Sequence, residues 1–89
     1  MKILKKNPAM NFFDRLVKIE RMDWLIRMEA TGNPHKFAKR VGVSESTLYE
    51  LLKLMKEMGA GIRYDKNKQT YGYLTSMKFQ FGFKTPDLT

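Results

Sequence analysis

Cysteine is absent from this sequence of 89 residues, and so is any long apolar run. The missing thiols exclude disulfide bonds, thiolate metal sites and cysteine nucleophiles. No apolar run approaches the ~20 residues that a membrane-spanning helix needs, and the apolar part of the opening MKILKK is too short for a signal peptide. We therefore expect a cytoplasmic protein that makes no contact with a membrane.

Residue patterns for catalysis are also scarce. His35 is the only histidine, and no carboxylate or second histidine stands at metal-ligand spacing from it, so an exposed structural histidine is favoured over a ligand. The sequence contains neither the phosphate-binding pattern G-x-x-x-x-G-K-S/T nor the dinucleotide-binding pattern G-x-G-x-x-G. Its serines have no basic partner at a recognisable offset. We expect a protein that is not an enzyme and that holds no metal or cofactor.

The chain is short, yet its composition favours folding. Hydrophobic residues make up 43% of it, which with their regular spacing is enough for one small core. We predict a flexible basic arm over residues 1–10, a single domain over 11–84 and a C-terminal tail over 85–89. One domain of this size leaves no room for a separate small-molecule effector domain.

The stretch from 33 to 59 carries the clearest pattern, which is two helices joined by a tight turn. Asn33 and Ser44 are good N-caps, Gly42 permits the positive φ of a sharp turn, and Gly59 ends the second helix. The apolar residues of each helix fall on one face, which predicts their burial: Phe37, Ala38 and Val41 in the first, and Leu48, Leu51, Leu52 and Met55 in the second. This arrangement is a helix-turn-helix.

A longer helix is predicted before this pair, from its cap at Asn11 to about Ala30. Trp24 falls at the edge of its apolar stripe, where it covers the core or seats a partner chain. The stripe itself is expected to face the core and comprises Phe12, Leu16, Ile19 and Ile26, widened by Phe13, Val17 and Leu25.

After Gly59 the apolar spacing changes to simple alternation. Residues 61–65 and 70–74 alternate around the polar residues 66–69, which predicts a β-hairpin. Residues 77–83 alternate as well, and this predicts an additional C-terminal strand with Met77, Phe79, Phe81 and Phe83 on one side. These phenylalanines require burial, either over the first helix or across the two-fold axis of a dimer.

The net charge of +8 is distributed unevenly. Residues 11–32 carry as many acids as bases, whereas residues 33–68 hold eight bases against four acids. This excess favours a polyanionic partner, because neutralising phosphates releases counterions; a solvated basic surface is the alternative. The three lysines of the arm either follow a phosphate backbone or belong to an untethered terminus.

Several of these residues stand in an order that resembles winged helix-turn-helix DNA-binding proteins, and more narrowly small bacterial regulators with a DeoR-like pattern. The resemblance covers residues 33 to 74 and rests on Ala38, Gly42-Val43-Ser44, Thr47-Leu48-Tyr49, Met58-Gly59, Ile62, Tyr64-Asp65 and Tyr71-Gly72-Tyr73. It implies an α+β fold of three helices followed by a β-hairpin wing, to which this chain adds the C-terminal strand. It also implies sequence-specific binding of double-stranded DNA by a transcriptional regulator or an accessory DNA-binding factor.

The resemblance further implies which residues meet DNA. In that family the second helix of the motif lies in the major groove, so residues 44–58 become the recognition helix and the wing at 65–69 lies on the backbone or in the minor groove. The residues expected at the DNA are Lys36, Lys39, Arg40, Ser44, Glu45, Ser46, Thr47, Tyr49, Lys53, Lys66 and Lys68.

Two acids depart from the family's usual pattern. Glu45 and Glu50 stand where such proteins often carry arginine, lysine or glutamine. A carboxylate can accept a hydrogen bond from a cytosine amino group but repels phosphates, and Glu45 can instead be a favourable charge at the start of its helix. A winged helix that binds another protein is therefore the alternative function. A homodimer through the first helix and the 77–83 strand is a further predicted partner.

Overall fold

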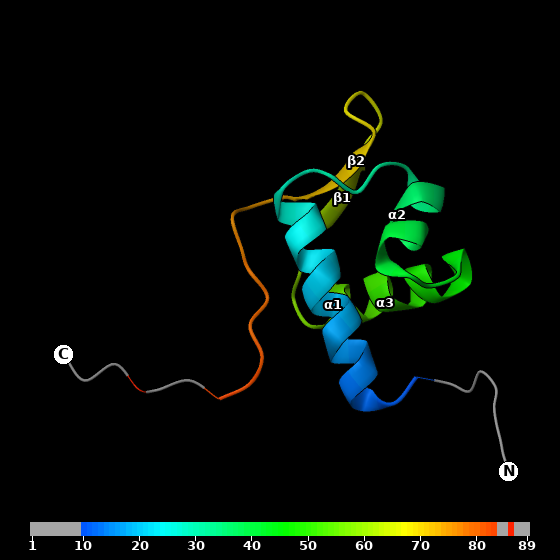
Figure 1. Ribbon diagram of the computed structural model, residues 1–89. Helices are drawn as coiled ribbons and strands as arrows, with labels where there is room; N and C mark the ends of the chain where they lie inside the picture. The colour runs from blue at the N-terminus through cyan, green and yellow to red at the C-terminus, as the bar shows by residue number, and fades with distance from the viewer. Residues whose placement is uncertain (1–9, 84–85, 87–89) are drawn as a thin grey trace, which may run out of the picture.

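Three helices precede a two-stranded antiparallel sheet in the computed structural model, which describes residues 10–83 and residue 86 (Figure 1). The elements are α1 (Phe12–Arg27), α2 (Pro34–Val41), α3 (Glu45–Glu57), β1 (Ile62–Asp65) and β2 (Thr70–Tyr73). This order confirms the predicted α+β class with the layout of a winged helix. The predicted arm, apart from Met10, and most of the predicted tail lie outside the described residues.

Each helix begins at the residue that the sequence predicts as its cap. The side chain of Asn11 accepts the N–H of Asp14 at 2.8 Å, and that of Asn33 accepts the N–H of Lys36 at 2.9 Å. Ser44 does the same for the N–H of Thr47 at 3.1 Å. These bonds satisfy backbone donors that have no partner inside the helix, so short local signals fix where α1, α2 and α3 start.

The turn between α2 and α3 depends on Gly42. Its φ of 85° lies in the left-handed region, where a side chain would be strained. In this conformation the N–H groups of Gly42 and Val43 both reach the carbonyl of Ala38, at 2.8 and 3.0 Å. The turn therefore ends α2 and redirects the chain into α3 within three residues, 42–44, as predicted.

The core lies where α1, α2, α3 and the hairpin meet. Phe37 of α2 is fully buried, and its ring lies 5.4 Å from that of Tyr71 in β2, so the hairpin packs directly on the helix-turn-helix. All the apolar positions predicted to be buried in α2 and α3 are buried: Phe37, Ala38, Val41, Leu48, Leu51, Leu52 and Met55. Helix α1 contributes Ile19, Met22, Leu25 and Ile26.

The predicted burial of α1 is wrong for its first turns. Phe12, Phe13 and Val17 are 72%, 62% and 42% exposed. Trp24, whose place at the edge of the stripe left both the core and a partner chain open, is 53% exposed. The reason is that α1 carries apolar residues around more than one face. Only one face packs on the rest of the chain, and Ile19 and Ile26 occupy it.

The predicted additional strand at 77–83 does not form within the described residues, which is a second correction. The chain bends at 74–75 and then runs without strand structure past α1, away from the hairpin (Figure 1). One physical reason lies at the outer edge of β2, where the N–H of Tyr71 already donates to Thr31 Oγ1 at 2.9 Å. The alternate residues of this segment are still the more buried ones. Met77, Phe79 and Phe81 are partly buried, whereas Phe83, the fourth apolar residue of the predicted strand, is fully exposed.

Candidate nucleic-acid interface

Helix α3 presents a polar face to solvent on the side away from the core. Ser44, Ser46, Glu50 and Lys53 are exposed, and Tyr49 is half exposed. Thr47 is partly buried, and its hydroxyl accepts a hydrogen bond from Ser44 Oγ at 3.1 Å. The structure therefore brings the recognition-helix residues predicted from the sequence onto one accessible surface.

The charge of α3 itself is close to zero. Its exposed residues include the acids Glu45, Glu50 and Glu57 against the bases Lys53 and Lys56. The positive charge of this half of the chain therefore lies beside α3 and not on it. Any polyanion at this surface would be held from the flanks.

Glu45 has a partner that sequence reasoning missed. Its carboxylate lies 3.0 Å from His35 Nδ1, so it links the first turn of α3 to the first turn of α2. As the first residue of α3 it also lies at the positive end of the helix dipole. The ion pair with His35 and the position at the start of α3 both give Glu45 a structural role. Glu50 has neither and lies on the exposed face of α3.

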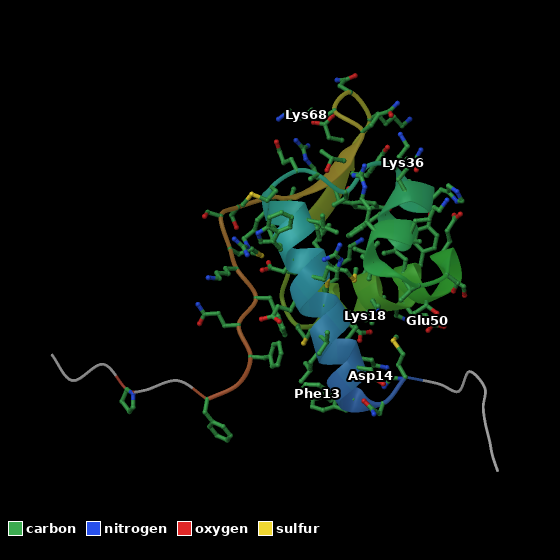
Figure 2. All side chains as sticks on the ribbon, in the orientation of Figure 1. Phe13, Asp14, Lys18, Lys36, Glu50 and Lys68 are labelled. Atoms are coloured by element: carbon green, nitrogen blue, oxygen red, sulfur yellow. The ribbon has the colours of Figure 1, made fainter. Side chains whose placement is uncertain are left out.

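Helix α2 forms the first basic flank. It carries Lys36, Lys39 and Arg40 on its exposed side and no acidic residue. The guanidinium of Arg40 donates to the carbonyl of Ala30, which holds the side chain against the linker between α1 and α2. Lys36 and Lys39 are thus the freer of the three bases, and Lys36 lies toward the same end of the molecule as Lys68 of the hairpin (Figure 2).

The hairpin tip forms the second basic flank. Asp65 Oδ1 accepts the N–H groups of Asn67 at 2.8 Å and Lys68 at 3.1 Å, and these bonds close the turn. The bond from Lys68 is the main cause that lowers the pKa of Asp65 below its ordinary value of 3.8. Lys66 is exposed at the tip, while the Lys68 ammonium lies 3.4 Å from the carboxylate of Glu29.

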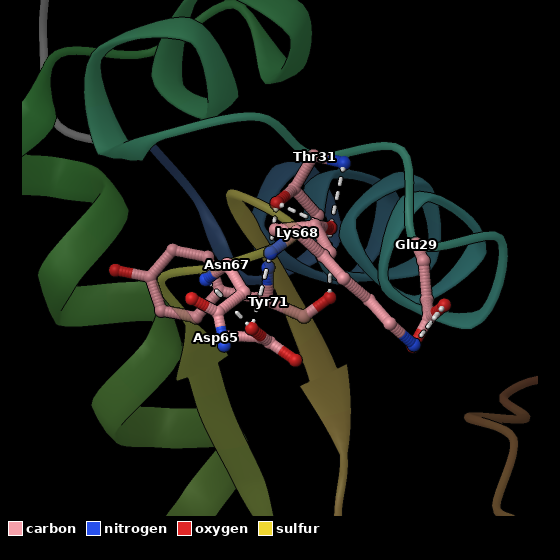
Figure 3. A network of polar contacts seen from close by, with 7 residues as sticks. Glu29, Thr31, Asp65, Asn67, Lys68 and Tyr71 are labelled. Carbon is pink, nitrogen blue, oxygen red and sulfur yellow. Dashed lines mark hydrogen bonds and ion pairs between the residues drawn. The ribbon is translucent and has the colours of Figure 1, made fainter.

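A buried pair of threonines sets the position of this hairpin. Thr31 in the linker between α1 and α2 and Thr70 at the start of β2 place their hydroxyl oxygens 3.1 Å apart (Figure 3). Thr31 Oγ1 also accepts the N–H of Tyr71, and its own N–H donates to Thr70 Oγ1 at 3.3 Å. The end of the hairpin next to its turn is therefore fixed to the segment that leads directly into α2.

A second polar contact holds the far end of β2. Tyr73 donates its phenolic hydrogen to the buried carboxylate of Asp23 at 2.6 Å, and Arg27 donates to the other carboxylate oxygen at 3.0 Å. Burial first, and the bond to Asp23 second, raise the pKa of Tyr73 above its ordinary value of 10.0. Strand β2 is thus tied to the α1–α2 linker at its start, through Thr31, and to α1 at its end, through Asp23.

Two bases of α1 lie in this region although no role was predicted for them. Arg15 and Lys18 line a groove of about 650 Å³ between α1 and α3, together with Ser44, Thr47, Glu50 and Lys53. The ammonium of Lys18 lies 3.2 Å from the carbonyl of Val41, the last residue of α2. The sequence offered no signal for this placement, because it depends on how α1 crosses α3.

Comparisons of the chain with models of known families, with curated proteins and with solved structures find no match. No helix in the described part of the chain is long and apolar enough to cross a membrane. Within the same residues, no three acidic or histidine side chains gather as they would around a metal ion. Function is therefore inferred from the arrangement of α2, α3 and the wing.

Proposed function

We propose that this protein binds double-stranded DNA sequence-specifically, as a transcriptional regulator or an accessory DNA-binding factor, with α3 in the major groove and the wing on the backbone or minor groove. The observation that carries the proposal is the exposed, nearly neutral polar face of α3 accompanied by two basic flanks. Such a face can enter a groove and offer hydrogen bonds to base edges, while lysines beside it neutralise phosphates. The protein works without a catalytic site or cofactor, in the cytoplasm.

The contacts divide by role. We assign the phosphate contacts to three exposed lysines, Lys36, Lys39 and Lys66. We assign the base contacts to residues in the middle of the exposed face of α3, which are Ser46, Glu50 and Lys53. Glu50 would accept a hydrogen bond from a cytosine amino group. Glu45 takes no part in base recognition here, because His35 holds its carboxylate.

The experiment is fluorescence-anisotropy binding to a random-sequence duplex from low to physiological salt. We expect affinity to fall steeply with salt, because each neutralised phosphate contributes about 0.9 to the slope of log K against log salt. Lys66→Glu with Lys68→Glu should weaken binding about equally on all sequences, and Lys66→Glu alone should reduce that slope by about one. Lys78→Glu, a change at an exposed lysine of the C-terminal segment, is the charge-matched control for Lys66→Glu alone.

A second candidate function is recognition of another protein by the same surface. The excess of acids over bases on α3 favours it, because Glu50 and Glu57 would repel a phosphate backbone at close range. Absence of duplex binding at low salt by a folded sample would remove DNA as the partner and leave this candidate. Binding to DNA with no change in the Lys66/Lys68 variant would remove the wing from the mechanism.

A further inference from the structure

The face of α1 that points away from the core is apolar. Phe13, Val17, Trp24 and Met28 follow one another at spacings of about one or two helical turns, so they form a single stripe, called here the outer stripe. All four are among the exposed large hydrophobic residues. A helix on the surface of a single domain normally carries polar residues on this face. We therefore expect another apolar surface to cover the outer stripe.

We propose that the outer stripe is the contact surface of a homodimer, in which α1 of one copy packs antiparallel against α1 of a second copy. The proposal does not rest on DNA binding. It keeps the first helix from the homodimer surface predicted from the sequence and leaves out the 77–83 segment, which forms no strand.

Charge identifies a second copy as the occupant. The chain carries a net charge of +8, so two copies repel each other across most of their surfaces. The outer stripe contains one charged residue, Glu20, and is bordered by Asp14, Arg21 and Arg27, so the two acids and two bases balance. This is a surface where two copies meet without net repulsion.

The order of residue sizes favours the antiparallel arrangement. Phe13 and Met28 are equally distant from the point between Glu20 and Arg21, and so are Val17 and Trp24. A two-fold axis at that point places each Trp24 opposite the small Val17 of the second copy, and each Phe13 opposite a flexible Met28. A parallel pair would instead stack Trp24 on itself, which packs less well.

The exposed area predicts a reversible dimer. An aromatic side chain offers 150–250 Å², so the exposed fractions of the four stripe residues amount to on the order of 400 Å² per copy. A standard interface buries about 800 Å² per partner, and the charged borders supply part of the difference. We therefore expect a dissociation constant in the micromolar range rather than the nanomolar range.

Sedimentation equilibrium of the full chain tests the proposal. We expect a concentration-dependent shift from 10.5 kDa to twice that mass. Added salt should strengthen the dimer by screening the positive charge, whereas it weakens binding to DNA. The opposite salt dependence keeps a failure of this proposal distinct from a failure of the proposed function. Trp24 is the only tryptophan, so its emission should shift to the blue as the dimer forms.

Three variants make the test specific. Trp24→Glu should raise the dissociation constant at least about 30-fold, and Glu20→Leu should lower it several-fold, because Glu20 is the one charge that lies within the outer stripe. Phe12→Glu is the control: Phe12 is at least as exposed as Trp24 but lies off the stripe. Urea midpoints near that of the wild type should show that all three remain folded.

Two results would overturn the proposal. One is a wild-type chain that stays monomeric at all concentrations in high salt, which would mean that another molecule covers the stripe. The other is a dimer that tolerates Trp24→Glu as well as Phe12→Glu, which would place the interface elsewhere.

Discussion

Replacing Thr31 by valine removes a hydroxyl that donates to the carbonyl of Gly32 and contacts the hydroxyl of Thr70. The change should destabilise the protein chiefly because the N–H of Tyr71 loses its acceptor. Thr31 is fully buried, and its hydroxyl oxygen accepts the N–H of Tyr71 at 2.9 Å. Valine has nearly the same shape, so no cavity forms and packing is retained. The N–H of Tyr71 then stays buried without a partner, because it points away from β1 at the outer edge of β2.

The expected cost follows from that orphaned donor. A buried donor left without its acceptor costs about 1–3 kcal/mol, so we expect the free energy of unfolding to fall by about 2 kcal/mol. For a domain of this size each kcal/mol lowers the melting temperature by roughly 4–8 °C. The loss is local in origin, yet it represents a large share of the stability of a chain this short.

Urea unfolding followed by circular dichroism measures this difference. Thr75→Val is the matched control, since Thr75 is exposed and the same change there should stay within about 0.5 kcal/mol. Equal stability of Thr31→Val and Thr75→Val would refute the reasoning, because it would mean that the threonine pair is replaceable by packing alone.

Two further predictions concern the core and the pH dependence of stability. Phe37→Ala removes a fully buried ring that contacts Tyr71 and should cost about 3–5 kcal/mol in urea unfolding; a loss below 1 kcal/mol would contradict the packing described. Because Tyr73 has a raised pKa in the folded state, the unfolded chain releases its proton first, and stability should fall as pH rises above 10.0. Tyr73→Phe should flatten that decline, and an unchanged alkaline profile would show that Tyr73 is not its source.

The helix-turn-helix was predictable because its signals are local. Asn33 and Ser44 act within three residues of their own position, and Gly42 sets the turn by its own backbone. The apolar faces of α2 and α3 were predictable for a related reason: each helix has only one such face, so its direction is unambiguous. The hairpin followed from alternation around a polar turn.

The outer surface of α1 was not predictable in this way. A helix with apolar residues on two faces does not indicate which face meets the core, so Phe13 and Val17 were assigned to the wrong side. The 77–83 strand failed for a different reason. Alternation describes only the strand itself, whereas a strand also needs a free neighbour, and Thr31 occupies the edge of β2.

For the candidate site, the exposure of the predicted residues could be read from the sequence, but their contacts with other side chains could not. The bases of α2 and the wing lie on the surface as expected, yet the contacts of Glu45 with His35 and of Lys68 with Glu29 join segments that are distant in sequence. Arg15 and Lys18 were not included because only the crossing of α1 and α3 brings them beside α3.

The polar ties of the hairpin also have a consequence for the order of folding. They join residues 39 to 50 positions apart, at Thr31–Thr70, Glu29–Lys68 and Asp23–Tyr73. Contacts between α2 and α3 span far shorter loops, whose closure costs less entropy. We therefore expect the helices to assemble before the wing docks. Substitutions at Thr31 should then speed unfolding while leaving the refolding rate nearly unchanged, so that the wing is the last part to join and the first to leave.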